Sequence, residues 1–423
     1  MIPSPADALL ALLAALPREA DLAVVRRERP GPAGGTRRQS EWVIGVAPDA
    51  RIEASGDEAL SWLDGLASGW WAGWLTYDLG RAVERVERRI PSDLGLPDLS
   101  LARFDTRLVV GPEGLRLEGD GPTRPLLISA VRRARAAGGP PLPPTTDLGL
   151  APFVSSLNRA GFEAGVSEII DLVRAGQCYQ VNLTRRLTSD TAADPLTLFG
   201  ALVRHHPAPH AALLRFGERA IVSASPERFL RRRGDLVETR PIKGTAGQRA
   251  VLERSAKDRA ENVMITDLAR NDLGRVCVPG SVAVPALCAA EAHPGLWHLV
   301  STVTGRLRPG VGTGALVRAT FPPASVTGAP KPRVLQAIED LEPVNRGVYC
   351  GAVGWVEPAA AALELNVAIR TFQILDGRTH LSVGGGITVD SDPAAEWRET
   401  ELKAARLLAV AGAPGHTGIG VPA

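Results

Sequence analysis

The 423-residue chain lacks the features of a disulfide-rich, membrane-spanning or nucleic-acid-binding protein. Its four cysteines lie far apart and form no C-x-x-C pair, which argues against a disulfide framework or a zinc site and favours a reducing cytoplasm. With 48 basic and 46 acidic residues the net charge is only +2, so the chain has no concentrated basic excess for nucleic acid or an anionic membrane. The most apolar early stretch, residues 8–16, is too short to cross a bilayer, and no basic residue precedes it as in a signal peptide.

The chain is also poor in lysine. Only four of the 48 basic residues are lysines, and the rest are arginines. Arginine keeps its charge at any working pH, so it cannot replace a lysine that acts as an amine nucleophile or a general base. Chance survival is the alternative for any single lysine, but all four lie after residue 150, which places the chemistry in that part of the chain. The four are Lys243, Lys257, Lys331 and Lys403.

A run rich in proline and glycine divides the chain. Residues 137–150 are expected to form a linker, because neither residue type sustains a helix or a sheet there. Residues 1–136 hold five of the eight tryptophans, and residues 69–78 alternate like a half-buried strand. An aromatic core is the simpler interpretation of this region, and a small-ligand pocket is the alternative. Residues 151–412 form the expected catalytic region, and residues 413–423 form a tail.

Helical and strand patterns mix after the linker without a βαβ rhythm. Residues 363–374 alternate apolar and polar side chains, which predicts a strand with one apolar and one polar face. We therefore expect an α+β fold in which large, mostly antiparallel sheets form a sandwich with helices packed outside. The expected helices are 162–175, 255–273 and 331–341, and the expected strands are 179–183, 220–224, 236–242, 347–356 and 363–374.

The last expected helix presents a stripe of charged side chains. Asp392 is a suitable N-cap before Pro393, and the helix should run to about residue 411. Glu396, Glu399 and Lys403 then share one face of the helix. Taken alone, this stripe is typical of a solvated surface with a Glu399–Lys403 ion pair.

Two neighbouring segments favour a binding site instead. Residues 384–386 are three glycines at the end of the preceding strand, where exposed backbone N–H groups permit a ligand, often an anion, to approach closely. Glu261 on the helix 255–273 could join the glutamates of the last helix in clamping a hard divalent cation such as Mg²⁺. An ordinary charged helix surface is the alternative for Glu261.

Two further charged residues follow strands at proline-containing turns. Pro241 and Gly244 are expected to place Lys243 on a tight turn, and the motif 225–229 does the same for Glu227. A lysine nucleophile must lose its proton, so its pKa has to fall through burial or neighbouring positive charge. A surface salt bridge is the alternative for both residues.

Together these segments resemble the chorismate-utilising enzymes, the family that includes anthranilate synthase component I, aminodeoxychorismate synthase component I, isochorismate synthase and salicylate synthase. The resemblance covers essentially all of residues 150–412, in the family's order, and extends weakly to the N-terminal region. The motifs are long enough to be specific. They lie at 223–229, 238–245, 256–280, 298–302, 321–331, 349–354, 366–371, 384–387 and 396–399.

The resemblance implies a magnesium-dependent reaction on chorismate. In the family, glutamates at the positions of Glu261 and Glu399 join Mg²⁺ to the ring carboxylate, and one at the position of Glu396 reaches the ion through water. The metal orients the substrate and stabilises charge as the C4 hydroxyl leaves. Glu227 matches the general acid that protonates this hydroxyl, and His298 matches a histidine near the ring.

The resemblance also implies how the rest of the substrate is held. Tyr349 and Arg370 match residues that hold the enolpyruvyl carboxylate, and Gly385 and Lys403 match anion-binding positions beside it. The predicted site comprises the catalytic residues Glu227, Lys243, Thr245 and His298, the substrate-binding residues Gln180, Tyr349, Arg370, Gly384, Gly385 and Lys403, and the metal ligands Glu261, Glu396 and Glu399.

Two positions distinguish the branches of the family. Isochorismate and salicylate synthases carry a lysine that acts as a base on water where this chain has Gln180, so hydration is disfavoured and an ammonia user is implied. Anthranilate synthases usually have alanine where this chain has Lys243, and the lysine resembles the aminodeoxychorismate synthase branch. If Lys243 attacks C2 and expels the C4 hydroxyl, ammonia then enters at C4 and expels the lysine, which gives 4-amino-4-deoxychorismate, the precursor of 4-aminobenzoate and folate.

The source of ammonia is expected to be a separate glutamine amidotransferase subunit. Cys178 does not lie in a nucleophile elbow, and the sequence shows no other arrangement typical of a glutaminase. Anthranilate synthase component I, and a non-catalytic relative that binds a small molecule, are the alternative functions.

Overall fold

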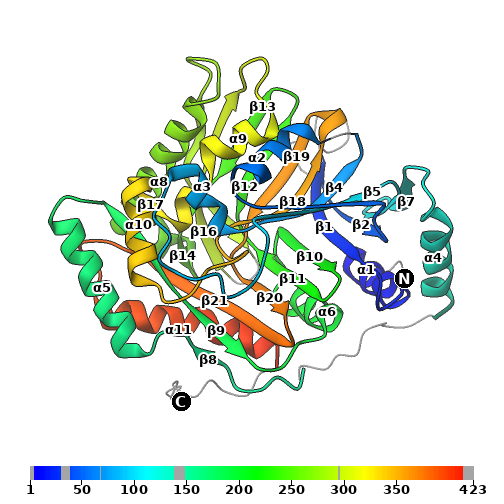
Figure 1. The fold of residues 1–423 in the computed structure, drawn as a ribbon, viewed down its shortest axis with the longest axis horizontal. Coiled ribbons are helices and arrows are strands. Elements are labelled where there is room, and N and C mark those ends of the chain that lie inside the picture. Colours follow the sequence, from blue (N-terminus) through cyan, green and yellow to red (C-terminus); the bar gives the residue numbers. More distant parts are fainter. Residues whose placement is uncertain (1–3, 30–38, 67, 138–147, 294–295, 413–423) are drawn as a thin grey trace.

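The protein is an α/β/β/α sandwich (Figure 1). The structure is a computed structural model that describes residues 4–29, 39–66, 68–137, 148–293 and 296–412. Two antiparallel sheets pack face to face, and helices cover their outer sides, which confirms the predicted α+β fold. Residues 138–147 of the expected linker and the tail 413–423 lie outside the described residues.

The first sheet has eleven strands in the order β17-β9-β21-β20-β11-β10-β1-β2-β6-β7, with β8 paired to β9. Its strands are β1 (Leu22–Arg29), β2 (Gln39–Val46), β6 (Arg107–Gly111), β7 (Gly114–Glu118), β8 (Val154–Ser155), β9 (Gln180–Ser189), β10 (His210–Phe216), β11 (Arg219–Ser225), β17 (Gly328–Ala329), β20 (Thr371–Leu375) and β21 (Arg378–Ile387).

The second sheet has ten strands in the order β14-β16-β13-β12-β19-β18-β4-β5-β3, with β15 paired to β16. Its strands are β3 (Ala50–Ala54), β4 (Trp70–Leu75), β5 (Leu99–Phe104), β12 (Arg228–Arg233), β13 (Leu236–Arg240), β14 (Ile242–Ala246), β15 (Ala283–His293), β16 (Leu296–Arg306), β18 (Ala352–Glu357) and β19 (Ala362–Val367).

The helices begin at the caps that the sequence supplies. Asp392 accepts a hydrogen bond from the N–H of Ala395 at the start of α11, and Ser255 accepts one from Asp258 at the start of α8. The α-helices are α1 (Pro5–Ala14), α2 (Gly56–Gly65), α3 (Gly80–Glu84), α4 (Arg124–Ala137), α5 (Arg159–Arg174), α6 (Pro195–His205), α7 (Arg249–Arg254), α8 (Ala256–Gly274), α9 (Thr313–Thr320), α10 (Lys331–Leu341) and α11 (Pro393–Val410). The 3₁₀ helices are η1 (Tyr77–Leu79), η2 (Ala324–Val326) and η3 (Pro358–Ala360).

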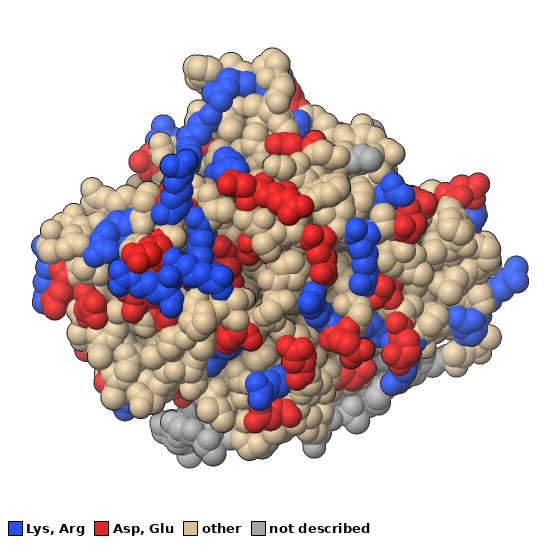
Figure 2. Space-filling view, viewed as in Figure 1, with Lys and Arg blue, Asp and Glu red and all other residues tan. Residues whose placement is uncertain are grey.

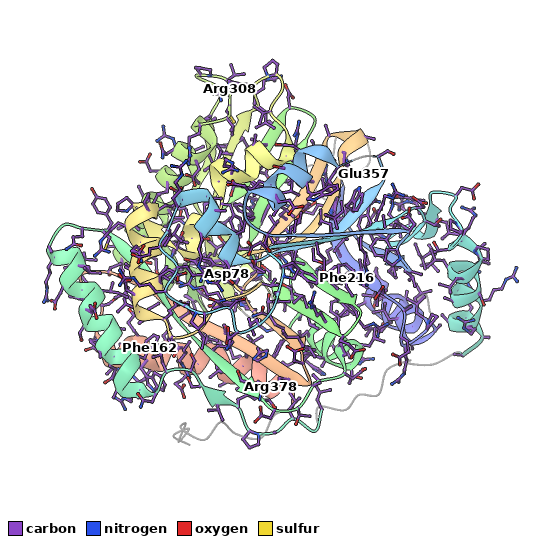
Figure 3. The ribbon with its side chains drawn as sticks, in the orientation of Figure 1. Asp78, Phe162, Phe216, Arg308, Glu357 and Arg378 are labelled. Atoms are coloured by element: carbon purple, nitrogen blue, oxygen red, sulfur yellow. The ribbon has the colours of Figure 1, made fainter. Side chains whose placement is uncertain are left out.

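The N-terminal region completes both sheets. Strand β1 pairs with β10 in the first sheet, and β4 pairs with β18 in the second. Two of its five tryptophans, Trp70 and Trp74, lie between the sheets, where Trp74 stacks at 5.3 Å between ring centroids on Phe216, which is labelled in Figure 3. Residues before and after position 137 therefore share one hydrophobic core.

Two expected strands differ from the structure. Residues 363–374 form not one strand but β19 and β20, which belong to different sheets, because the chain turns at Arg370 with a φ of 52°. The polar face of β19 is buried rather than solvated: Glu364 is 4% exposed and accepts from the Arg228 guanidinium at 3.0 Å. Strand β4 is likewise buried throughout, not half-buried. Alternation of polarity marks the two faces of a strand, but only tertiary packing decides whether the polar face meets water.

Helix α11 is fixed to the first sheet by aromatic and charged contacts. Phe162 of α5 packs edge-on against Trp397 at 5.7 Å (Figure 3), and the Arg185 guanidinium of β9 lies 4.2 Å from the same ring. Arg185 also pairs with Glu401 of α11, and both side chains are buried. These contacts hold the charged stripe of α11 beside the glycine end of β21.

The surface charge and the apolarity of the helices are relevant to the nucleic-acid-binding and membrane-spanning classes of protein. Lysine and arginine alternate with aspartate and glutamate over the face in Figure 2, as the small net charge predicts. Within the described ranges, no helix is long and apolar enough to cross a membrane.

Candidate active site

A cavity of about 610 Å³ lies where the β14–β16 edge of the second sheet faces β9 and β21 of the first, closed by α8 and α11. Twelve of the thirteen predicted site residues line it. The protein therefore brings together segments that are more than 170 residues apart in the sequence. The twelve are Glu227, Lys243, Thr245, Glu261, His298, Tyr349, Arg370, Gly384, Gly385, Glu396, Glu399 and Lys403.

Gln180, the thirteenth predicted residue, lies just behind the cavity wall. Its side chain is fully buried at the start of β9, and neither its amide nitrogen nor its amide oxygen has a hydrogen-bond partner among the described residues. A Cβ placed on Gly386 would lie 2.6 Å from Gln180 Nε2 and 3.2 Å from Lys243 Nζ. The Gln180 amide and the Lys243 amine thus converge on one glycine.

Gly386→Ala is expected to lower turnover by about 10- to 100-fold, because the methyl group must displace the Gln180 amide or the Lys243 amine and misplacement by about 1 Å has effects of this size. Steady-state kinetics measures the loss, and thermal unfolding should show a nearly unchanged midpoint. Gly65→Ala is the control, since a Cβ at Gly65 meets no atom within 4 Å. Wild-type turnover in Gly386→Ala would contradict this close approach.

Lys243 occupies a strand rather than the tight turn expected from Pro241 and Gly244. It lies in β14 opposite Leu299 of β16, with a register shift before Thr245. Edge pairing with β16 continues past the proline because Pro241 falls between β13 and β14 and removes no N–H from either strand. Burial lowers the pKa of the Lys243 amine, while the carboxylates of Glu261 and Glu227 act in the opposite direction.

Glu227 lies between β11 and β12 with its carboxyl group buried. The backbone N–H of Ile242 donates to Glu227 Oε1 at 3.4 Å. Burial raises the Glu227 pKa to about 7, and a hydrogen bond from Ser325 and the nearby Lys243 amine oppose this rise. A carboxyl group of this kind is largely protonated just below neutral pH and can donate a proton.

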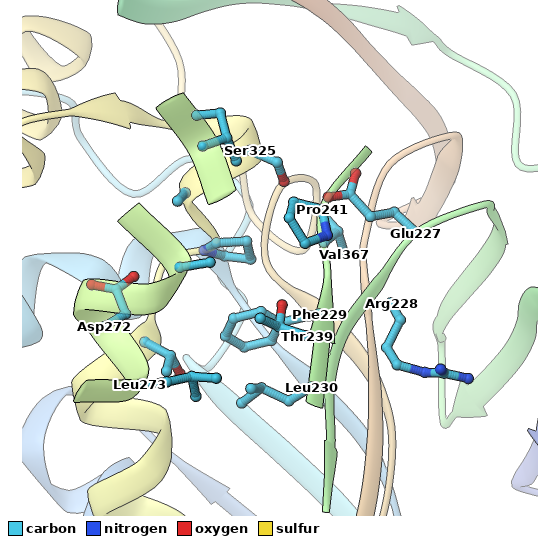
Figure 4. A pocket seen from close by; sticks show the side chains of 15 residues that line it. Glu227, Arg228, Phe229, Leu230, Thr239, Pro241, Asp272, Leu273, Ser325 and Val367 are labelled. Atoms are coloured by element: carbon cyan, nitrogen blue, oxygen red, sulfur yellow. The ribbon is translucent and has the colours of Figure 1, made fainter. Parts of the chain in front are cut away.

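A second, much smaller cavity of about 20 Å³ lies on the other side of Glu227. Figure 4 shows Glu227 and Ser325 on one side of it and Asp272 of α8 on another. Its remaining walls are largely apolar, including Phe229 and Leu230. Glu227 therefore has an apolar surround behind it and the large cavity in front, which explains the upward shift of its pKa.

His298 faces the cavity as a neutral imidazole. Its Nδ1 lies 2.8 Å from the Thr245 hydroxyl, the residue opposite it in the β14–β16 pair. Burial, the neighbouring His293 ring and Arg370 lower the His298 pKa to about 4. Nε2 of His298 is buried with no hydrogen-bond partner among the residues described, so it can donate to or accept from a bound molecule.

Three carboxylates from α8 and α11 face one another across the cavity. Burial and the like charge of Glu399 raise the pKa values of Glu261 and Glu396, whereas the Lys403 ammonium, at 2.7 Å, lowers that of Glu399. Asn262 positions α8 against β16 by donating a hydrogen bond to the backbone oxygen of Leu299 at 2.9 Å. In the described part of the chain, no three metal-ligating side chains are gathered into a preformed cluster.

This donor set fits Mg²⁺. Mg²⁺ binds through one or two carboxylates and keeps several waters, so it does not require a preformed three-ligand cluster. Burial and, to a smaller extent, the like charge of Glu399 raise the Glu261 and Glu396 pKa values, and a divalent cation would offset both effects. Glu261 and Glu399 are thus the residues that would hold the ion, with Glu396, fixed by Ser391 at 2.7 Å, beside them.

The remaining wall carries Tyr349 and Arg370. Tyr349 is buried, and burial raises the pKa of its hydroxyl. Arg370 has a φ of 52°, a backbone conformation that is uncommon for a residue with a side chain and is often found at functional sites. On α11, Lys403 donates to the Gly384 carbonyl at 2.7 Å, which joins the helix to the glycine strand.

Several lining residues were not predicted. Ser325 lies inside a recognised motif, and Lys257, 3.9 Å from Glu261, stood out by the scarcity of lysine. No sequence pattern indicated that His206 or Arg406 lines the cavity, because one is an ordinary residue at a helix end and the other an ordinary residue on a helix surface. Lys331, whose role the sequence left open, does not line the cavity; its buried ammonium pairs with Asp272 at 2.8 Å.

Comparison with known proteins places this architecture and cavity in a family. A family described as "chorismate binding enzyme" matches residues 35–409. Aminodeoxychorismate synthase component 1 of Klebsiella aerogenes is 39% identical over 342 residues, which cover 78% of this chain and 75% of that protein. Anthranilate synthase component 1 1 of Haloarcula marismortui is 36% identical over 364 residues, covering 79% of this chain and 74% of that protein.

A solved structure agrees with the fold and the sheet arrangement. Anthranilate synthase component I from Streptococcus pneumoniae superposes with a TM-score of 0.76 at 26% identity, covering 87% of this chain and 92% of that one. The matched range 35–409 includes every named strand except β1 and all the residues that line the cavity. The chain therefore belongs to the chorismate-binding enzymes.

Proposed function

We propose that this enzyme aminates chorismate to 4-amino-4-deoxychorismate in a magnesium-dependent reaction, using ammonia from a separate glutamine amidotransferase subunit, in the route to 4-aminobenzoate and folate. Relatives named aminodeoxychorismate synthase component 1 support this choice. The four cysteines are buried free thiols, which suits the expected cytoplasmic location.

The observation that carries the proposal is the presence of Lys243 and Glu227 in the same cavity. Burial lowers the Lys243 pKa and raises the Glu227 pKa, so it favours the neutral form of both groups. A neutral amine is a nucleophile, and a neutral carboxyl group is an acid. Burial thus favours both of the forms that a displacement needs.

Two displacements account for the product. The Lys243 nitrogen bonds to C2 of chorismate, the two conjugated ring double bonds shift, and the C4 hydroxyl leaves as water with the proton of Glu227, which regains a proton from the new C2 ammonium. Ammonia then bonds to C4, the two double bonds shift back, and the Lys243 amine leaves C2 with a proton from the incoming nitrogen. The two displacements place the amino group at C4.

The other cavity residues bind and orient the substrate. Mg²⁺, held by Glu261 and Glu399, would supply charge stabilisation at the ring carboxylate as the hydroxyl leaves. Tyr349 and Arg370 hold the carboxylate of the enolpyruvyl side chain. The unpartnered Nε2 of His298 faces the ring and the departing oxygen.

Metal dependence gives a direct prediction. A chelator should abolish turnover, and Glu261→Gln should raise the Mg²⁺ concentration for half-maximal turnover by about 10- to 100-fold, because loss of one carboxylate weakens a site built on few protein ligands. Titration of initial rate against Mg²⁺ measures the shift. Glu253→Gln, on the exposed surface of α7, should leave the titration unchanged. Full turnover of Glu261→Gln at wild-type Mg²⁺ concentrations would contradict the assignment.

Product analysis tests the function itself. The purified chain is incubated with chorismate, Mg²⁺ and a large excess of an ammonium salt near neutral pH, which supplies free ammonia while Glu227 is still partly protonated, and the products are separated by mass and retention. The proposal predicts 4-amino-4-deoxychorismate. Anthranilate, the product named for the relatives from Haloarcula and Streptococcus, would overturn it and place Lys243 outside the reaction, and no turnover of chorismate would favour a binding protein.

A further inference from the structure

Two guanidinium groups at one end of the cavity have no carboxylate partner. Arg370, between β19 and β20, and Arg406 of α11 both line the cavity, and neither forms an ion pair with a described residue. Arg406 follows Glu399 by seven residues, so it lies on the same face of α11, about 10 Å further along the helix. Helix α11 therefore runs from the carboxylates at one end of the cavity to a guanidinium at the other.

His206 contacts Arg370 from the end of a neighbouring helix. It is the residue that follows α6, and α6 packs against α11. Arg370 Nη1 lies 3.3 Å from His206 Nε2. A guanidinium can only donate, so Nε2 must accept and the imidazole proton must be on Nδ1. Burial and the nearby Arg370 and Arg406 lower the His206 pKa to about 4, which keeps the ring in this accepting form at neutral pH.

This arrangement suits an anion. Burial and the Arg406 charge lower the Arg370 pKa to about 10, because the opposing effect of Glu227 is smaller. The partly buried Arg370 guanidinium, which forms no ion pair with a described residue, would be compensated by a carboxylate that accepts from its fork. The titratable groups that interact electrostatically with Arg370 are His206, Arg406, His293, His298 and Glu227.

We propose that Arg406 supplies a second guanidinium for the side-chain carboxylate of the substrate, and that His206 is a positioning residue that orients Arg370 toward the same carboxylate. Together the three residues make the basic end of the cavity favour substrates that carry this second carboxylate. The inference rests on the proposed function for the class of substrate.

Direct binding of two aromatic acids tests the role of Arg406. The probes are 3-carboxymethoxybenzoate, a dicarboxylate, and 3-hydroxybenzoate, which lacks the second carboxylate, each measured by calorimetry with Mg²⁺ present. Arg406→Gln should weaken the dicarboxylate by about tenfold or more, as expected for loss of a charged hydrogen bond, and leave the monocarboxylate within about twofold. Arg406→Lys, which keeps the charge but not the fork, should fall between.

Arg398→Gln is the matched control. It removes the same charge from an exposed position of α11 that does not line the cavity, so both affinities should stay at wild-type values. Equal weakening of both probes by Arg406→Gln, or the same effect from Arg398→Gln, would mean that Arg406 acts only through the general field, and would overturn the proposal. A wild-type protein that does not prefer the dicarboxylate would overturn it as well.

The positioning role of His206 has its own readout. His206→Gln retains an acceptor near the place of Nε2 and should bind the dicarboxylate nearly as the wild type does, whereas His206→Ala should weaken it several-fold with no change for the monocarboxylate. Equal behaviour of the two variants would overturn this part. Because both tests measure binding, they are independent of the product. Formation of anthranilate would contradict the proposed function but would not affect the proposed binding of a carboxylate by Arg406 and Arg370.

Discussion

Lys243→Ala and Lys243→Arg should both lose formation of 4-amino-4-deoxychorismate by about 10³-fold or more, a loss typical of removing a covalent nucleophile. Lys243 lines the cavity together with Glu227 and Glu261, and partial burial lowers the pKa of its amine. Arginine keeps the positive charge but cannot form the bond to C2. Rates measured by product separation, with thermal unfolding as a check on folding, give the comparison.

A chemical rescue separates nucleophile from structural lysine. Lys243→Cys should be inactive and should regain activity after alkylation with 2-bromoethylamine, which rebuilds a primary amine of nearly the same length. The four native cysteines are buried, so treated wild-type enzyme serves as the control. Substantial activity in Lys243→Arg would show that only the charge is needed and would contradict covalent catalysis.

Glu227→Gln should lower kcat by about 10²- to 10⁴-fold, the range for loss of a general acid. The acid must be protonated, and its pKa is about 7, so wild-type turnover should fall as pH rises above about 7. The lysine must be deprotonated, so turnover should rise from the acid side toward the lowered Lys243 pKa. The two requirements oppose each other, and the fall in turnover above about pH 7, the alkaline limb, should vanish in Glu227→Gln if it reports on Glu227.

Ser325→Ala gives a sharper form of the same test. The Ser325 hydroxyl donates to Glu227 and lowers its pKa, since it favours the charged form. Removing it should raise the Glu227 pKa and move the alkaline limb to higher pH. A limb that stays in place in both variants would assign it to another group.

Local signals in the sequence predicted the elements that carry the site. The cap Asp392 predicted the start of α11, the helical pattern of residues 255–273 predicted α8, and the glycine run predicted the end of β21, because caps and glycines act within a few residues. The resemblance to the family's motifs then identified the residues that line the cavity. These parts of the fold and site follow from short-range chemistry and specific motifs.

Other features depend on pairing across the chain and could not be derived from local pattern. Lys243 belongs to a strand only because β16 offers an edge, and the polar face of β19 is buried only because Arg228 meets Glu364. His206 and Arg406 are 200 residues apart, and no spacing rule relates them. Gln180 lies behind the wall rather than in it, since its position depends on how closely β9 and β21 approach at Gly386.

Detection of the covalent adduct tests the central claim most directly. The enzyme is incubated with chorismate and Mg²⁺ in the absence of ammonia, quenched in acid, digested and analysed by peptide mass spectrometry. The double displacement predicts that the peptide containing Lys243 gains the mass of chorismate less one water, and that ammonium added before the quench removes the label. An unmodified Lys243 peptide, from enzyme that forms 4-amino-4-deoxychorismate when ammonium is present, would contradict it.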